Sequence, residues 1–365
     1  MGSPLRVGVI GVGHISAQYF EQFPALPGIR LVAVADLSAE RAAAVAAEQG
    51  VRALGVDELI ADPDVDMVLN LTIPAAHAEI GIRALKAGKH VYGEKPLALS
   101  PDEGAPLLAL AAERGLRVGS APDTVLGTGV QTARRLLDDG AIGEPVAAAV
   151  HWSAAGHERW HPAPQFYYQP GGGPLFDMGP YYLTSLVTLF GPVLRVSGTS
   201  RRSVRERSIA TGPLAGTAIA VEVDTHINAL LEHADGVTAT VTMSFDVWAT
   251  KTPLFEVYGT SGTLAVPDPN QFSEPVSLYT ADEPGWTTVE ASVGYRDAGR
   301  GYGLADMARA IETDRPHRAS GELAFHVLEI MDAVLRAGRE HRVVELSSTV
   351  KRPEAVPEGA TPDSW

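Results

Sequence analysis

The chain has 365 residues, 45% of them hydrophobic and 20% charged, which suits two globular domains and excludes a disordered chain. A formal net charge of -15 argues against nucleic acid or an anionic membrane as a partner, and the lack of cysteine excludes disulfides and thiolate metal sites. No apolar stretch reaches the ~18 residues of a membrane span. The N-terminal residues indicate a strand rather than a signal peptide, so we expect a cytoplasmic protein.

Short apolar runs alternate with helical patterns in the first third of the chain. The runs are LRVGVIGVG, IRLVAVAD, VDMVLNL, KHVYG and LRVGS. Helical patterns lie between them, over 15–23, 38–50 and 74–87 and from Ser100 onward. Strands that are apolar on both faces belong to parallel sheets covered by helices on both sides. The sequence therefore predicts an α/β domain with a parallel sheet.

Glycines mark the turn between the first strand and the first helix. Gly11 would form the tight turn, and Gly13 would let backbone N–H groups approach a pyrophosphate. Ser16 replaces the third glycine of the usual G-x-G-x-x-G pattern, so a plain glycine turn is the alternative. Asp36 ends the second strand about 20 residues later, where an acid binds the adenosine ribose diol. Because a carboxylate repels a 2′-phosphate, we predict NAD, with NADP less favoured.

Two stretches follow the third and fourth strands, at the sheet edge where ligands bind. In NLTIPAAH, Thr72 is expected to line the cofactor and His77 to face the ribose or the pyrophosphate; a surface histidine is the alternative. In GEKP, Lys95 precedes Pro96, which favours extended geometry and allows a cis bond. Lys95 is a candidate proton relay, with a solvated loop lysine as the alternative. The predicted cofactor-binding residues are Gly11, Gly13, His14, Ile15, Asp36, Thr72, Pro74, His77, Glu94 and Lys95.

The block GGGPLFDMGPYYL, residues 171–183, places a lone carboxylate and two tyrosines after three glycines. If a helix begins after Pro174, Asp177 and Tyr181 stand at i and i+4 on one face. That arrangement would direct a carboxylate and a phenol toward one small ligand. Tyr182 is predicted to be a core residue.

Alternating segments later in the chain predict an antiparallel sheet. The segment 225–247 predicts two strands joined around Asp235-Gly236, and 254–266 predicts a second hairpin. One face is polar and the other apolar, as in a sheet covered on one side. Amphipathic helices are predicted over 302–317 and 321–338. His326, on the second, is predicted to be a packed or surface histidine rather than a ligand.

Four segments together resemble the Gfo/Idh/MocA oxidoreductases, the glucose–fructose oxidoreductase and inositol dehydrogenase type. They are GVIGVGHIS, VAVAD, GKHVYGEKPLA and GGGPLFDMGPYYL, in the family's order and spacing over almost the whole chain. The resemblance implies an N-terminal Rossmann domain and a C-terminal α/β domain built on a large, mostly antiparallel open sheet. It also implies a nicotinamide between the domains, with a sugar or cyclitol above it. The predicted domains are 1–122 and 123–347, followed by a C-terminal tail at 348–365.

The resemblance also implies site roles. The family's usual histidine, four residues after the aspartate, is Tyr181 here, as in glucose–fructose oxidoreductases and dimeric dihydrodiol dehydrogenases. Lys95, Asp177 and Tyr181 form the implied catalytic set. Tyr181 would exchange the proton, assisted by a neighbouring ammonium, and Asp177 would bind a substrate hydroxyl or hold Lys95. A core phenol on an amphipathic helix is the alternative for Tyr181.

An aromatic- and histidine-rich loop precedes the glycines, and Trp160 and His161 are predicted to contact the substrate there; packing alone is the alternative. His157 and His161 have the spacing of a metal pair. However, prolines at 162 and 164 argue against a helix and no third ligand is evident, so no metal is predicted.

The sequence thus predicts NAD-dependent hydride transfer to or from a secondary hydroxyl or ketone of a sugar, glycoside or cyclitol. One alternative keeps the fold but retains NAD and cleaves glycosides by oxidation and elimination. The other is a catalytically silent NAD-binding regulator. We expect a small carbohydrate or cyclitol as partner, with neither nucleic acid nor membrane, and the family implies a homodimer or homotetramer.

Overall fold

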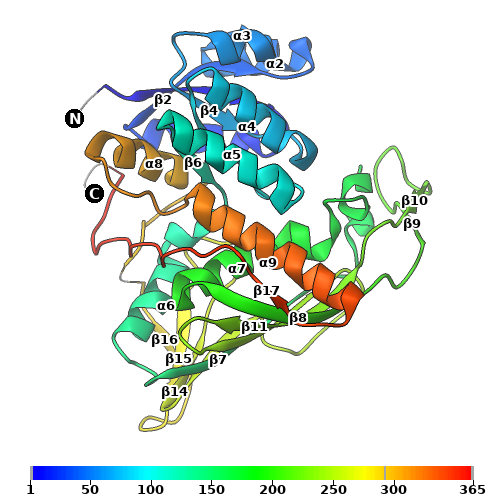
Figure 1. Cartoon of the computed structure of the whole chain (residues 1–365), viewed down its shortest axis with the longest axis vertical. Helices are drawn as coiled ribbons and strands as arrows, with labels where there is room; N and C mark the ends of the chain where they lie inside the picture. The colour runs from blue at the N-terminus through cyan, green and yellow to red at the C-terminus, as the bar shows by residue number, and fades with distance from the viewer. Residues whose placement is uncertain (1–2, 292, 363–365) are drawn as a thin grey trace. The chain divides into compact units, whose positions relative to one another are not determined.

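The computed structural model describes residues 3–291 and 293–362 and divides into two compact units (Figure 1). Unit 1 takes in the chain as far as Gly127, then Val293–Phe325 and the stretch from Pro353 onward. Unit 2 consists of Thr128–Ser292 and His326–Arg352. This differs from the predicted domains, because two late segments return to the first unit.

Buried polar groups explain the return of the late segments. Asp123, fully buried, accepts hydrogen bonds from the N–H groups of Gly301 and Gly303 at 2.9 and 3.0 Å. The guanidinium of Arg318 donates to the carbonyl of Ala355 at 3.1 Å, which holds part of the predicted tail. Such long-range partners leave no periodic signal in the sequence.

Unit 1 is built on a parallel sheet with the strand order β3-β2-β1-β4-β5-β6. This is the order of the doubly wound dinucleotide-binding fold, and it confirms the predicted parallel α/β domain. Strand β3 was not predicted, because it is a short edge strand whose side chains are mostly exposed. The strands are β1 Leu5–Ile10, β2 Ile29–Ala35, β3 Arg52–Leu54, β4 Met67–Asn70, β5 His90–Gly93 and β6 Val118–Ser120.

Local capping sets the limits of the helices in unit 1. The second helix begins after Ser38, whose hydroxyl accepts from the N–H of Arg41 at 3.2 Å, and it ends at Gly50 in the left-handed conformation. The short helix α3 was not predicted. The helices are α1 Ser16–Gln22, α2 Ala39–Gln49, α3 Val56–Ala61, α4 His77–Lys86, α5 Pro101–Arg114 and α8 Tyr302–Thr313, with short 3₁₀ turns η1 Phe23–Ala25, η2 Pro74–Ala76 and η3 Thr124–Leu126.

Unit 2 is built on a mostly antiparallel sheet with the order β16-β15-β14-β13-β7-β12-β11-β8-β17, in which β7 and β12 pair in parallel. Both predicted hairpins are present: His226 pairs with Ser244, and Glu256 pairs with Ala265. The strands are β7 Pro145–Ser153, β8 Val193–Arg201, β11 His226–His233, β12 Thr238–Ser244, β13 Phe255–Gly259, β14 Gly262–Ala265, β15 Val276–Thr280, β16 Thr287–Val289 and β17 Val344–Glu345.

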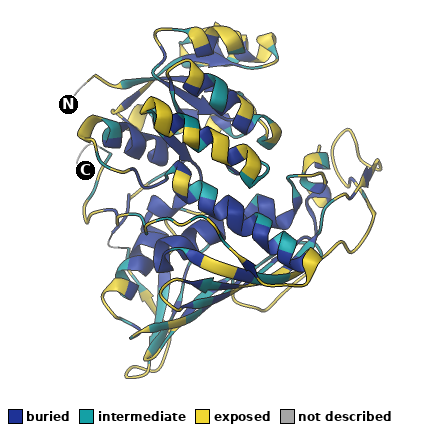
Figure 2. Cartoon of the chain, viewed as in Figure 1, coloured by how far each residue is buried: buried dark blue, intermediate teal, exposed yellow. Residues whose placement is uncertain are grey.

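Helices cover one face of this sheet. Helix α7, Gly173–Phe190, contacts β7, β11 and β12, and Figure 2 shows it as one of the most deeply buried elements. Every residue of this fully described helix except Asp177 is buried. The other elements are α6 Thr128–Asp138, α9 Gly321–Glu340, the 3₁₀ turns η4 His157–Arg159 and η5 Gln165–Tyr168, and a separate ribbon of β9 Glu206–Ser208 and β10 Ala218–Ala220.

None of the helices among the described residues combines the length and the hydropathy that a membrane-spanning segment requires.

Candidate active site

The glycine turn after β1 has the shape that a dinucleotide needs. Gly11 has a φ of +92°, and a Cβ there would lie 2.7 Å from the carbonyl oxygen of Leu71. A Cβ on Gly13 would meet nothing within 4 Å. Gly13 and His14 are exposed, so the backbone at this turn is open to a ligand. An open backbone of this kind is what the predicted pyrophosphate site at this turn requires.

Asp36 ties the glycine turn to the next helix. Its Oδ2 accepts from the N–H of Val12 at 3.0 Å, and its Oδ1 accepts from the N–H of Ser38 at 2.9 Å. The Arg41 guanidinium lies 3.5 Å from Oδ1. Asp36 is thus fixed at the carboxyl end of β2, the position from which an acid binds the ribose diol.

His77 lies inside the protein, between two loops. Its Nδ1 is 2.7 Å from the carbonyl oxygen of Pro96, and its Nε2 is 3.0 Å from that of Thr72. Burial lowers the pKa of this imidazole. Both ring nitrogens face backbone carbonyl oxygens. This placement differs from the predicted orientation toward the ribose or the pyrophosphate. The hydroxyl of Thr72 donates to Asn70 Oδ1 at 2.6 Å.

Glu94 and Lys95 follow β5. The buried Glu94 accepts from the Tyr19 hydroxyl at 2.8 Å through Oε1 and from the N–H of Lys95 at 3.0 Å through Oε2. Glu94 is predicted to bind the cofactor, and in this structure its carboxylate also holds the backbone that carries Lys95. The Lys95–Pro96 peptide is cis, and Lys95 is half-buried. Two other residues predicted to contact the cofactor are half-buried in the same unit: Ile15 directly precedes α1, and Pro74 begins η2.

Helix α7 presents Asp177 and Tyr181 one turn apart, as predicted from their spacing. Asp177 Oδ2 lies 2.8 Å from His157 Nε2, and the side chain of Asp177 is 13% exposed. Tyr181 is buried. The adjacent Tyr182 is fully buried, its hydroxyl donates to Asp268 at 3.0 Å, and burial raises its pKa. The two tyrosines therefore have different surroundings.

His157 is the residue that sequence reasoning missed. The sequence indicates it only as half of a metal pair with His161, yet its Nε2 lies 2.8 Å from Asp177 Oδ2 and its Nδ1 accepts from the Trp160 indole at 3.1 Å. His161 Nδ1 accepts from the N–H of Ala163 at 3.1 Å. Both ring nitrogens of His157 thus form hydrogen bonds within the chain. The density of aromatic residues was the available signal, but the partner carboxylate lies on another element.

The glycines at the start of α7 allow close packing of the chain. A Cβ on Gly172 would lie 2.5 Å from the carbonyl oxygen of Phe166, and Gly173 has a φ of +83°. Larger residues would push the start of α7 away from the loop that carries His157. At Gly172 it is the chain itself, at Phe166 and Tyr167, that approaches the glycine backbone closely.

A buried polar network anchors the same loop. The hydroxyl of Tyr168 accepts from the N–H of His157 at 3.0 Å and donates to Glu158. Arg207, on the β9–β10 ribbon, donates to Glu158 Oε1 at 2.9 Å and pairs with Asp246. Because buried charges are stable only when paired, this network ties the His157 loop to the ribbon.

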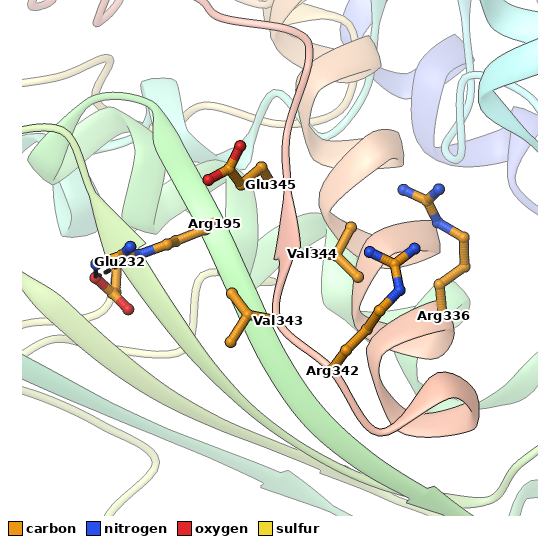
Figure 3. A pocket seen from close by; sticks show the side chains of 7 residues that line it. All are labelled: Arg195, Glu232, Arg336, Arg342, Val343, Val344 and Glu345. Atoms are coloured by element: carbon orange, nitrogen blue, oxygen red, sulfur yellow. Dashed lines mark hydrogen bonds and ion pairs between the residues drawn. The ribbon is translucent and has the colours of Figure 1, made fainter.

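Figure 3 shows a hollow elsewhere in unit 2, beside β8 and β17. Arg195 donates to Glu232 there at 2.6 Å, so part of its charge is paired internally. The hollow contains none of the predicted site residues, and we do not assign the active site to it. Its lining residues are Arg195, Glu232, Arg336, Arg342, Val343, Val344 and Glu345.

The strand order, the open glycine turn and the acid at the end of β2 define unit 1 as a dinucleotide-binding domain. Residues 5–121 match the family model of the oxidoreductase family with an NAD-binding Rossmann fold, and residues 130–265 match the GFO/IDH/MocA C-terminal domain. The chain belongs to the Gfo/Idh/MocA family of oxidoreductases.

Individual relatives agree with this assignment. The chain is 36% identical over 238 residues to dTDP-3,4-didehydro-2,6-dideoxy-alpha-D-glucose 3-reductase from Streptomyces violaceoruber, covering 63% of this chain and 68% of that protein. It is 35% identical over 164 residues to inositol 2-dehydrogenase 3 from Saccharopolyspora erythraea, covering 44% and 48%. The fold is similar to that of an NAD binding oxidoreductase from Klebsiella pneumoniae, with a TM-score of 0.81, 23% identity, and coverage of 96% and 100%.

Proposed function

We propose that the protein catalyses NAD-dependent oxidation of a secondary hydroxyl, or reduction of the matching ketone, on a sugar, glycoside or cyclitol. The observation that carries this proposal is that Asp177 and Tyr181 lie one turn apart on the same face of α7. A carboxylate and a phenol suit a polyol, because one can bind a hydroxyl while the other exchanges its proton. Relatives named as a sugar reductase and an inositol dehydrogenase support the substrate class.

Unit 1 holds the cofactor in this proposal. The turn at Gly11 and Gly13 receives the pyrophosphate, and Asp36 accepts hydrogen bonds from the ribose diol. When bound, NAD supplies the hydride acceptor or donor. The carboxylate of Asp36 repels a 2′-phosphate, so NADP is disfavoured.

The remaining roles concern the proton and the substrate. Tyr181 exchanges the proton of the reacting hydroxyl, and Asp177 accepts a hydrogen bond from a substrate hydroxyl. The ammonium of Lys95 stabilises negative charge on the reacting oxygen and relays the proton. Trp160, which is 58% exposed, offers an indole face to a sugar ring, with His161 beside it.

A substrate panel tests the proposal. Purified protein with NAD is offered inositols, aldoses, glycosides and nucleotide sugars, and NADH formation is followed by its absorbance. We expect net NADH with at least one ring polyol. Release of an aglycone without net NADH would instead support cleavage with retained NAD. If NAD binds but the whole panel is inert in both directions, the dehydrogenase proposal fails and the regulator alternative gains support.

The homodimer or homotetramer implied by the family stays a prediction, which light scattering would test.

A further inference from the structure

Two hydrogen bonds on opposite sides of one ring determine the protonation of His157. The Trp160 indole nitrogen, which can only donate, lies 3.1 Å from His157 Nδ1. Nδ1 must therefore be the unprotonated nitrogen. The ring proton is then on Nε2, which lies 2.8 Å from Asp177 Oδ2 and donates to it. Donor chemistry thus selects the neutral Nε2–H tautomer.

The imidazole is held in this orientation by its surroundings. Its side chain is 8% exposed, and aromatic rings pack around it. The backbone N–H of His157 donates to the buried hydroxyl of Tyr168 at 3.0 Å. The ring-centroid distances from His157 are 4.5 Å to Tyr167, 4.5 Å to Phe245, 5.1 Å to Trp160 and 6.0 Å to Trp152.

We propose that His157 is a positioning residue, which fixes the Asp177 carboxylate through its Nε2–H and is itself fixed in that tautomer by Trp160. The proposal rests on the proposed function in that it gives Asp177 a role in substrate binding. A carboxylate on a helix can rotate about χ1 and χ2, and a short hydrogen bond to Oδ2 removes much of that freedom. Preorganisation of this kind lowers the cost of binding a substrate hydroxyl in one orientation.

The same geometry argues against His157 as a proton shuttle or a metal ligand. Protonation of Nδ1 would set an N–H against the indole N–H, and a metal at either nitrogen would displace Trp160 or Asp177. Trp160 therefore has an inward role, through its indole nitrogen, in addition to its exposed face.

The first test is spectroscopic and needs no substrate. The full-length protein is labelled with ¹⁵N-histidine, and His157→Gln identifies the His157 resonances among the 11 histidines. We expect a protonated Nε2 and an unprotonated Nδ1, as the two hydrogen bonds require. Asp177→Asn should shift the Nε2 resonance, and Trp160→Phe should allow the other tautomer or the doubly protonated form. A native ring that is Nδ1-protonated or cationic would overturn the proposal.

The second test separates the donor from the ring. His157→Ala should lower kcat/KM by about 10- to 100-fold, the scale of a misplaced binding group. His157→Gln can still present an N–H near the position of Nε2, so it should recover most of that loss. His226→Gln, at a histidine on β11, is the matched control and should stay near native. Thermal melts of each variant check folding.

The outcomes distinguish this inference from the proposed function. If the native protein turns over nothing in the panel, the proposed function fails, while the tautomer measurement still decides the state of His157. If the native protein is active but folded His157→Ala is equally active, or folded His157→Gln is as impaired as His157→Ala, the positioning role is wrong.

Discussion

Neighbouring tyrosines on α7 differ in what their hydroxyls can do. Tyr182 donates to Asp268 in a fully buried position, whereas Tyr181 shares its helix face with Asp177. Tyr181→Phe should therefore lower kcat by roughly 10²–10⁴ with little change in stability. Tyr182→Phe should leave kcat nearly intact and lower the free energy of unfolding by roughly 1 kcal/mol, the net value of one hydrogen bond. Steady-state kinetics and urea unfolding of both variants measure this, and a damaged kcat only in Tyr182→Phe would contradict our register for the site.

Asp36 gives a prediction about cofactor choice. The double variant Asp36→Ser with Leu37→Arg removes the repelling charge and adds a cation at a side chain that is 99% exposed. We expect kcat/KM for NADP to rise and that for NAD to fall, because a 2′-phosphate gains a partner and the ribose diol loses one. Leu37→Arg alone is the control, since Asp36 remains. Equal use of NAD and NADP by the native protein would refute the role given to Asp36.

At the scale of elements, the loop after β5 is held by a helix. Tyr19, on α1, donates to Glu94, which accepts in turn from the N–H of Lys95. Tyr19→Phe leaves a buried carboxylate oxygen without this donor and should cost about 1–3 kcal/mol of unfolding free energy. It should also lower kcat, but less than Lys95→Ala, for which we expect a loss of roughly 10²–10⁴. Unchanged stability and kcat in Tyr19→Phe would show that Glu94 does not need this support.

Periodicity predicted the elements whose faces are buried in a regular way. The apolar strands of the parallel sheet and the alternating hairpin of β11 and β12 follow directly from it. By contrast, β3 is exposed, and the return of Val293–Phe325 to unit 1 depends on buried polar groups such as Asp123. Local patterns carry no information about such distant partners.

In the candidate site, too, local features could be predicted from the sequence, whereas contacts between distant segments could not. The spacing of Asp177 and Tyr181 is a property of one helix and could be predicted. The contact of His157 with Asp177 joins a loop to that helix, and the buried ring of His77 contacts two loops. Neither contact could be predicted from a local sequence pattern. Glu94 shows the same limit, because its partner Tyr19 lies far away in the sequence.

At the scale of the whole molecule, we expect buried histidines to make stability depend on pH. Burial lowers the pKa of several imidazoles, and that of His326 falls to about 4. His326 is fully buried, with Nε2 accepting from the N–H of Val193 at 3.0 Å and Nδ1 lying 2.8 Å from the Ser348 hydroxyl. A ring that accepts at Nε2 must be neutral. Three deeply buried histidines with a lowered pKa are His233, His317 and His326.

The sign of the effect follows from linkage. In the unfolded chain these histidines bind protons near pH 6.5, whereas in the folded protein they stay neutral to lower pH. Their contribution to stability is therefore fully present above about pH 6.5. It is lost as the pH falls toward the folded pKa, which is about 4 for His326. Asp123 acts in the opposite direction, because burial raises its pKa.

We therefore expect the free energy of unfolding to fall when the pH is lowered from 7.5 to 5, with the loss beginning near pH 6.5. For His326 the lowered pKa corresponds to at most about 3 kcal/mol, since each pKa unit is worth about 1.4 kcal/mol. His326→Gln keeps an acceptor within reach of Val193 but cannot be protonated, so its unfolding free energy should depend less steeply on pH over this range. Urea unfolding of the native protein, of this variant and of His226→Gln at several pH values measures the three slopes. Equal slopes for the native protein and His326→Gln would mean that His326 does not stay neutral in the fold, whereas a reduced slope in His326→Gln alone would assign that part of the acid sensitivity to one buried ring.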